Sequence, residues 1–107
     1  MSVWVPTVSA VADLQDIHSY GEANWGQRRA RNYIAELYEL FDELGQRPGL
    51  GVLRAELGEA MRSFPKGSHI TFYRARGDRI IVARVVHGSM DHARLFDEYD
   101  PMADLPA

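Results

Sequence analysis

The clearest pattern along the chain is an apolar stripe that repeats about every 3.6 residues between positions 30 and 44, with charged residues opposite. This spacing predicts an amphipathic helix that packs its stripe against another layer. The stripe consists of Ala30, Tyr33, Ile34, Leu37, Leu40, Phe41 and Leu44. Gly45, Pro48, Gly49 and Gly51 follow and end the helix.

A shorter apolar repeat precedes this helix and predicts a first one. Its apolar face is formed by Val11, Leu14, Ile17 and His18. Ser9 is the N-cap candidate, because its hydroxyl can accept from the amides of the first turn. A turn over Asn24, Trp25 and Gly26 then leads into the second helix. Two helices joined so closely form an antiparallel hairpin, and their shared stripe requires a sheet to cover it.

Four segments are predicted as the strands of that sheet. Val3–Val5 is a short first strand closed by Pro6, and Met61–Pro65 is an edge strand because proline tolerates only an edge or a strand end. His69–Arg76 and Arg79–His87 are longer and joined by a tight turn at 77–78. The order β-α-α-β-β-β predicts an α+β fold, with the helical hairpin on one face of a small, mainly antiparallel sheet.

A two-residue loop at 77–78 would fix which residues of the two long strands share a face. It pairs Thr71 with Arg84 and His69 with Val86. One face then carries Ile70, Phe72, Ile81, Ala83 and Val85, the expected floor for the helical hairpin. The other carries His69, Thr71, Tyr73, Val82, Arg84 and Val86, and little of the chain is left to cover it.

Arg84 and the end of its strand form the first candidate site. A cation inside an apolar, β-branched run is costly unless it is paired or faces something polar. The strand stops at His87 and Gly88, and Asp91 follows in a short acidic turn.

The chain of 107 residues is predicted to be a single domain, 1–107, without internal repeats or a linker. The segment 98–107 is acidic and contains proline, so we expect a mobile tail. No apolar run approaches the roughly 18 residues that span a bilayer, and the N-terminus lacks signal-peptide features. There is no cysteine, and a cytoplasmic location is expected.

The charge balance argues against direct binding of nucleic acid. The net charge is −3 and Lys66 is the only lysine, whereas proteins that bind phosphates usually carry a basic excess. Two local clusters are predicted to be a solvated helix start and a polar hairpin end. They are Arg28, Arg29 and Arg31, and Arg74, Arg76 and Arg79.

Four segments follow one another in a characteristic order: Leu44–Pro48, Arg62–Phe64 with Gly67, Phe72 with Tyr73, and Ile81–Val86 followed by His87-Gly88-x-x-Asp91. Together they resemble the ParE/RelE superfamily of bacterial toxins from type II toxin–antitoxin systems. The resemblance covers about residues 2–96.

The His-Gly-x-x-Asp ending is more similar to the ParE-like branch. That resemblance implies a toxin that inhibits DNA gyrase without cutting nucleic acid, and a cognate antitoxin that forms a hetero-oligomer with it. Operator DNA would be contacted only through the antitoxin. ParE-like chains commonly place arginine directly before the aspartate, where this chain has Met90, so no role is assigned to a cation there.

The alternative is a RelE-like enzyme that cleaves messenger RNA on the ribosome. Such cleavage needs a base, an acid and a cation for the phosphorane charge. Arg62, Tyr73, Arg84 and His87 would supply these groups, with His69 or Lys66 nearby. The negative net charge and single lysine argue against this enzyme. A third reading is a degenerate member that only binds its antitoxin and regulates their operon.

Structural roles are open for the same residues. His87 could cap its strand by bonding to the following turn, with Asp91 starting a last helix, and Arg62 and Arg84 could pair with acidic residues of the chain. The four histidines show no metal-ligand spacing, and no phosphate-binding glycine motif is present. No metal or cofactor is therefore expected.

The antitoxin is predicted to bind the uncovered sheet face. Tyr73, Val82 and Val86 would offer apolar anchors around Arg84. An amphipathic helix or an added strand of the antitoxin could bury them and bring a carboxylate to the arginine.

Overall fold

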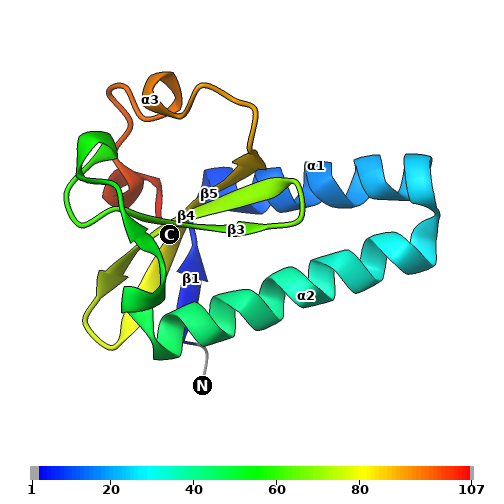
Figure 1. Cartoon of the computed structure of the whole chain (residues 1–107), viewed down its shortest axis with the longest axis horizontal. Coiled ribbons are helices and arrows are strands. Elements are labelled where there is room, and N and C mark those ends of the chain that lie inside the picture. The colour runs from blue at the N-terminus through cyan, green and yellow to red at the C-terminus, as the bar shows by residue number, and fades with distance from the viewer. Residues whose placement is uncertain (1–2, 107) are drawn as a thin grey trace.

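The computed structural model describes residues 3–106 and places a helical hairpin on one face of a five-stranded sheet (Figure 1). The strand order is β1-β5-β4-β3-β2, with β1 parallel to β5 and the other neighbours antiparallel. The elements are β1 (Trp4–Pro6), α1 (Val8–Trp25), α2 (Gln27–Gln46), η1 (Pro48–Leu50), β2 (Val52–Leu53), η2 (Ala55–Leu57), β3 (Arg62–Lys66), β4 (His69–Arg76), β5 (Arg79–His87), α3 (His92–Leu95) and η3 (Pro101–Asp104). The predicted α+β architecture is confirmed.

The helical hairpin is tighter than expected, because only Gly26 separates α1 from α2. Its φ of 92° is a conformation that glycine adopts without strain. The N-cap of α1 is Thr7 rather than Ser9. The Thr7 hydroxyl accepts from Ala10 N over 3.0 Å and donates to Ala83 O over 2.7 Å. Ser9 already lies inside the helix, so its predicted capping role was wrong.

The two long strands have the predicted limits, but their register shifts halfway along. Tyr73 pairs with Val82 as expected, whereas Phe72 pairs with Arg84. Ala83 is therefore an extra residue on β5, a β-bulge that moves every later pair by one position. The predicted pairs Thr71–Arg84 and His69–Val86 were wrong, because Thr71 opposes Val85 and His69 opposes His87.

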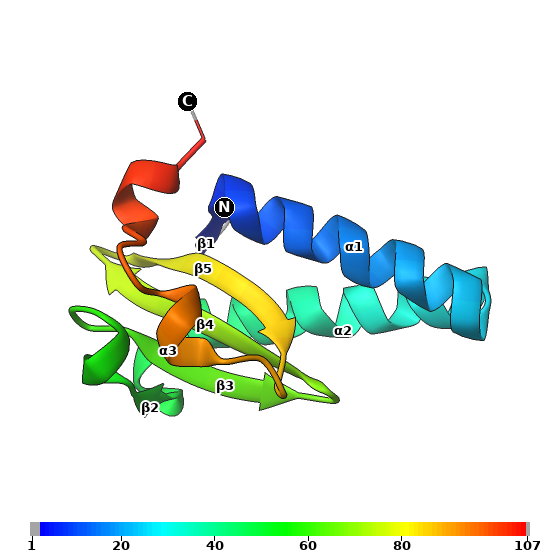
Figure 2. The ribbon, with the colours of Figure 1, turned by 90° about the horizontal axis from the view of Figure 1, so that it is seen from above.

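The predicted assignment of the sheet faces was also wrong. The core under the hairpin contains Tyr73, Ile80, Val82 and Val85 together with Leu37, Phe41 and Leu44 of α2. The opposite face buries Phe72, Ala83 and Val86 beneath Leu57, Met61 and Phe96. Figure 2 shows the hairpin and α3 on opposite sides of the sheet. Apolarity could not distinguish the faces, since both are covered.

The C-terminal segment supplies much of the layer that covers the sheet face opposite the helical hairpin. Phe96 is buried against Phe72, and Pro101 is buried as well. Asp104 accepts from Ser9 N over 3.1 Å and from the Tyr99 hydroxyl over 2.6 Å. Asp104 thus lies against the start of α1, and the mobility of the tail stays a prediction. Ala107 falls outside the described residues.

The predicted edge strand gains a neighbour that the sequence did not reveal. The two-residue strand β2 pairs with Arg62 and Ser63 of β3. Pro65 lies beyond this pairing, where its missing N–H costs no bond to β2.

The carboxylate at the end of the tail gives a pH-dependent prediction. Hydrogen bonds from Ser9 and Tyr99 lower the pKa of Asp104. A carboxyl whose pKa is lowered by folding adds stability above its unfolded pKa of about 3.9, and this stability is lost as the pH falls below it. Asp104→Asn should therefore lower the melting temperature near neutral pH, and the difference from the wild type should shrink in acid.

Thermal unfolding followed by circular dichroism over this pH range measures the difference. Asp97→Asn is the matched control, because it removes the same charge from an exposed residue. A pH-independent difference for Asp104→Asn would contradict the assigned linkage.

Candidate partner-binding site

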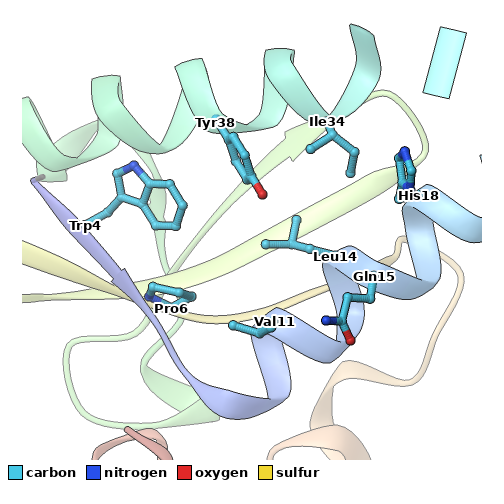
Figure 3. A pocket seen from close by; sticks show the side chains of 8 residues that line it. All are labelled: Trp4, Pro6, Val11, Leu14, Gln15, His18, Ile34 and Tyr38. Atoms are coloured by element: carbon cyan, nitrogen blue, oxygen red, sulfur yellow. The ribbon is translucent and has the colours of Figure 1, made fainter. Parts of the chain in front are cut away.

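An open apolar groove of about 390 Å³ lies between β1 and the two helices (Figure 3). It is lined by Trp4, Pro6, Val11, Leu14, Gln15, His18, Ile34 and Tyr38. Each of the three elements contributes residues from one of its faces. The lining residues of α1 are three or four positions apart and those of α2 are four apart, as on one face of a helix. Those of β1 are two apart, as on one face of a strand. The groove therefore follows from the same periodicities that build the fold.

The groove wall is partly fixed and partly exposed. The Trp4 ring packs edge-on against Phe41, with centroids 4.9 Å apart, and its Nε1 donates to Asp42 Oδ1 over 2.9 Å. By contrast, Val11 is 40% exposed and Tyr38 is 43% exposed. At the other end, His18 Nδ1 lies 3.1 Å from Glu22 Oε1. An apolar surface with polar ends suits an amphipathic peptide segment.

The predicted antitoxin-binding face is not open in this structure. Tyr73 and Val82 are buried under the helical hairpin, and Val86 is buried with Phe96 on the opposite side. The bulge at Ala83 splits the predicted set between the two faces. A partner would have to displace the chain's own helices or tail to reach these side chains.

Arg84 has a partner within the chain. Its Nε and Nη2 donate to the Asp13 carboxylate over 2.7 and 2.9 Å, a bidentate pair. The amide of Val85 donates to the same carboxylate over 3.0 Å. The hydrogen bond that Arg84 donates to Asp13 raises the pKa of Arg84, which stays charged. Asp13 therefore neutralises the cation and ties α1 to the bulge of β5.

Tyr73 and Arg62 hold the chain after α2 against the sheet. The buried Tyr73 hydroxyl donates to Pro48 O over 2.6 Å and accepts from Gly51 N over 2.8 Å. Burial raises the pKa of Tyr73, so the phenol is neutral. Arg62 Nη1 donates to Gly51 O over 2.8 Å. Both predicted nuclease residues are thus engaged in backbone contacts.

The predicted functional strand end forms a turn. Nδ1 of the exposed His87 lies 2.7 Å from Ser89 Oγ, and Gly88 N donates to Ser68 O over 2.9 Å. Asp91 caps α3 by accepting from Arg94 N over 3.2 Å. This agrees with the structural alternative for His87 and Asp91.

The four predicted nuclease residues do not converge on one site. Arg62 and Tyr73 are a cross-strand pair, whereas His87 pairs with His69 four residues further along β4. That spacing corresponds to roughly 13 Å along a strand. Nδ1 of His69 lies 2.7 Å from the Tyr33 hydroxyl, and burial together with nearby His87 lowers the pKa of His69. Within residues 3–106, no group of three or more His, Asp or Glu side chains is arranged to hold a metal ion.

Comparison with known proteins identifies the family of this chain. The sequence profile of the family described as "ParE toxin of type II toxin-antitoxin system, parDE" matches residues 5–92. The chain belongs to the ParE toxin family. The match spans the helical hairpin, the sheet and the turn at His87, so the resemblance inferred from the sequence is confirmed.

Individual relatives agree with this membership. Toxin ParE1 of Caulobacter vibrioides is 39% identical over 82 residues, which cover 77% of this chain and 84% of that protein. Toxin ParE1 of Mycobacterium tuberculosis is 34% identical over 84 residues, which cover 78% and 86%. The fold is similar to a solved chain from the chromosomal ParDE system of P. aeruginosa, with a TM-score of 0.67 at 21% identity over 81% of this chain and 96% of that one.

ParE-family membership makes the chain a toxin of a toxin–antitoxin system and implies an antitoxin as partner. Residues 93–106, which add Phe96 and Tyr99 to the cover of the sheet face opposite the hairpin, lie beyond the part that the family profile matches. No helix among the described residues is long and apolar enough to cross a membrane.

Two features of this ParE-family chain escaped the sequence analysis. The groove was missed for two reasons. Three of its residues were assigned to the stripe that the two helices share: Val11, Leu14 and His18. Two others lie on other elements, Trp4 on β1 and Tyr38 on α2. The pairing of Asp13 with Arg84 was missed although a signal exists, since an aspartate next to Leu14 sits close to an apolar helix face.

The Asp13–Arg84 pair gives a stability prediction. Asp13→Asn should lower the free energy of unfolding by about 3 kcal/mol, because it leaves a largely buried cation without a counter-charge. Urea unfolding measures the change. Asp16→Asn is the control, because Asp16 is exposed on the same helix. Equal stability of the two variants would show that the pair contributes nothing.

Proposed function

We propose that the chain inhibits DNA gyrase when its antitoxin is absent, and that it does so without cutting nucleic acid. Family membership supports the toxin role. The observation that carries the choice between branches is the engagement of the nuclease candidates: Tyr73 and Arg62 hold backbone groups, and Arg84 is paired with Asp13. A ribonuclease would need these groups free and close together.

The antitoxin, in this proposal, binds the groove between β1 and the helices rather than the sheet face. An amphipathic helix would bury Val11, Tyr38 and Ile34, which are accessible without any rearrangement of the toxin. From Val11 to His18 the groove runs for about 10 Å along α1, two turns of a docked helix. Operator DNA is contacted through the antitoxin, in keeping with the net charge of −3.

Inducible expression of the chain alone tests the target. Gyrase inhibition should produce filamentation and an SOS response, and the purified chain should inhibit supercoiling by gyrase. Rapid translation arrest with cuts in ribosome-bound messenger would instead identify a ribonuclease. Unaffected growth would identify a member that acts only in antitoxin binding and operon regulation.

A variant in the groove tests the antitoxin site. Val11→Glu should weaken antitoxin binding by about tenfold or more, because it places a charge among side chains that the complex would bury. Calorimetry with the purified cognate antitoxin measures the affinity. Ala12→Glu adds the same charge to the neighbouring exposed position, which does not line the groove. Wild-type affinity of Val11→Glu would place the antitoxin elsewhere.

A further inference from the structure

A second surface with the character of an interface lies around Trp25, where Gly26 joins the two helices. Trp25 stands between two hollows of about 340 and 300 Å³. The first is bounded by Ile17 and Tyr20 of α1 and by the two histidines at the end of the sheet. The second is bounded by Arg29, Tyr33 and the turn at 67–68. In Figure 1 the joint of the hairpin extends beyond the strands.

The aromatic side chains here are exposed yet held in place. Trp25 is 40% exposed and Tyr20 63% exposed. The Trp25 ring makes edge contacts with Tyr20 and Tyr33, with centroids 5.9 and 6.3 Å apart. The Tyr33 hydroxyl donates to Lys66 O over 2.9 Å, which anchors this side to the sheet. Rings fixed before binding lose little conformational freedom in a complex, and Trp, Tyr and Arg dominate interface hot spots.

The charge beside Trp25 is positive and unpaired. Arg28, Arg29 and Arg31 are exposed, and none of them makes an ion pair within residues 3–106. The Arg29 guanidinium lies 5.5 Å from the Trp25 ring centroid, a cation–π contact. Two carboxylates nearby already have partners within the chain, since Glu22 lies against His18 and Glu36 against Lys66. A partner with carboxylates would complement these arginines.

We propose that the Trp25 surface, defined as Tyr20, Trp25, Arg28 and Arg29 with the two hollows, binds the target protein. The target segment places an apolar side chain beside Trp25 and carboxylates against the two arginines. This inference rests on the proposed action on gyrase. Ile17, Tyr20 and Trp25 give the first hollow an apolar wall, which suits a protein side chain and offers nothing to a phosphate backbone.

The Trp25 surface is separate from the groove of Figure 3. The two share no lining residue, and the groove is bounded by Trp4 and Tyr38 instead. Changes at Trp25 should therefore affect the target and leave the antitoxin unaffected.

The test measures two affinities in parallel for the full chain. Trp25→Ala and the double variant Arg28→Glu, Arg29→Glu should raise the concentration for half-inhibition of gyrase supercoiling by about tenfold or more. Their affinity for the purified antitoxin, measured by calorimetry, should stay at the wild-type value. Arg76→Glu, Arg79→Glu is the matched control, because it makes the same charge change at the exposed turn between β4 and β5. This control should inhibit gyrase like the wild type.

The outcomes separate the inference from the function beneath it. If the wild type inhibits gyrase and both Trp25-surface variants do so equally, the inference is wrong and the proposed function stands. If the wild type does not inhibit gyrase, both fail. Loss of antitoxin binding, an equal loss in the charge control, or variant-sensitive binding of the toxin alone to duplex DNA would each overturn the inference. Circular dichroism checks folding, and the arginine variant remains decisive if Trp25→Ala unfolds.

Discussion

One carboxylate joins α1 to β5, two elements that lie far apart in the sequence. Asp13 accepts hydrogen bonds from the Arg84 side chain and from the amide of Val85, directly after the point where β5 gains its extra residue. The carbonyl of that extra residue, Ala83, is bonded by the Thr7 hydroxyl. The backbone groups on both sides of the bulge are thus hydrogen-bonded by α1 and its N-cap residue. These bonds stabilise the bulge as a regular part of the sheet.

The bulge decides the arrangement of everything beyond it. A shift of one residue turns the following side chains to the opposite face. Val85 thereby joins the core under the hairpin, whereas Val86 joins the core under the C-terminal segment. His87 comes to lie opposite His69, at one side of the Trp25 surface.

The sequence allowed the helices and strands to be predicted, but not which face of the sheet each strand residue occupies. Helix periodicity located the stripe from Ala30 to Leu44, and alternation gave the limits of β4 and β5, because both depend on local spacing. The bulge could not be found in this way, since it depends on Asp13, which is 71 positions away from Arg84. The C-terminal cover was missed for a related reason. An acidic, proline-containing segment has little local structure, and its position on the sheet depends on distant contacts such as Asp104 with Ser9.

The fold also constrains when a nascent chain can become a finished toxin. The first strand is parallel to β5, with Trp4 opposite Ile80, and α1 begins against Asp104 near the other terminus. The groove includes Trp4 of that first strand, so its wall forms only after β5 has been synthesised and has paired. Contacts this distant along the chain also close slowly, because a long loop must be ordered first. During synthesis the apolar stripe of the helical hairpin therefore stays uncovered until the strands that follow it have been made and have paired.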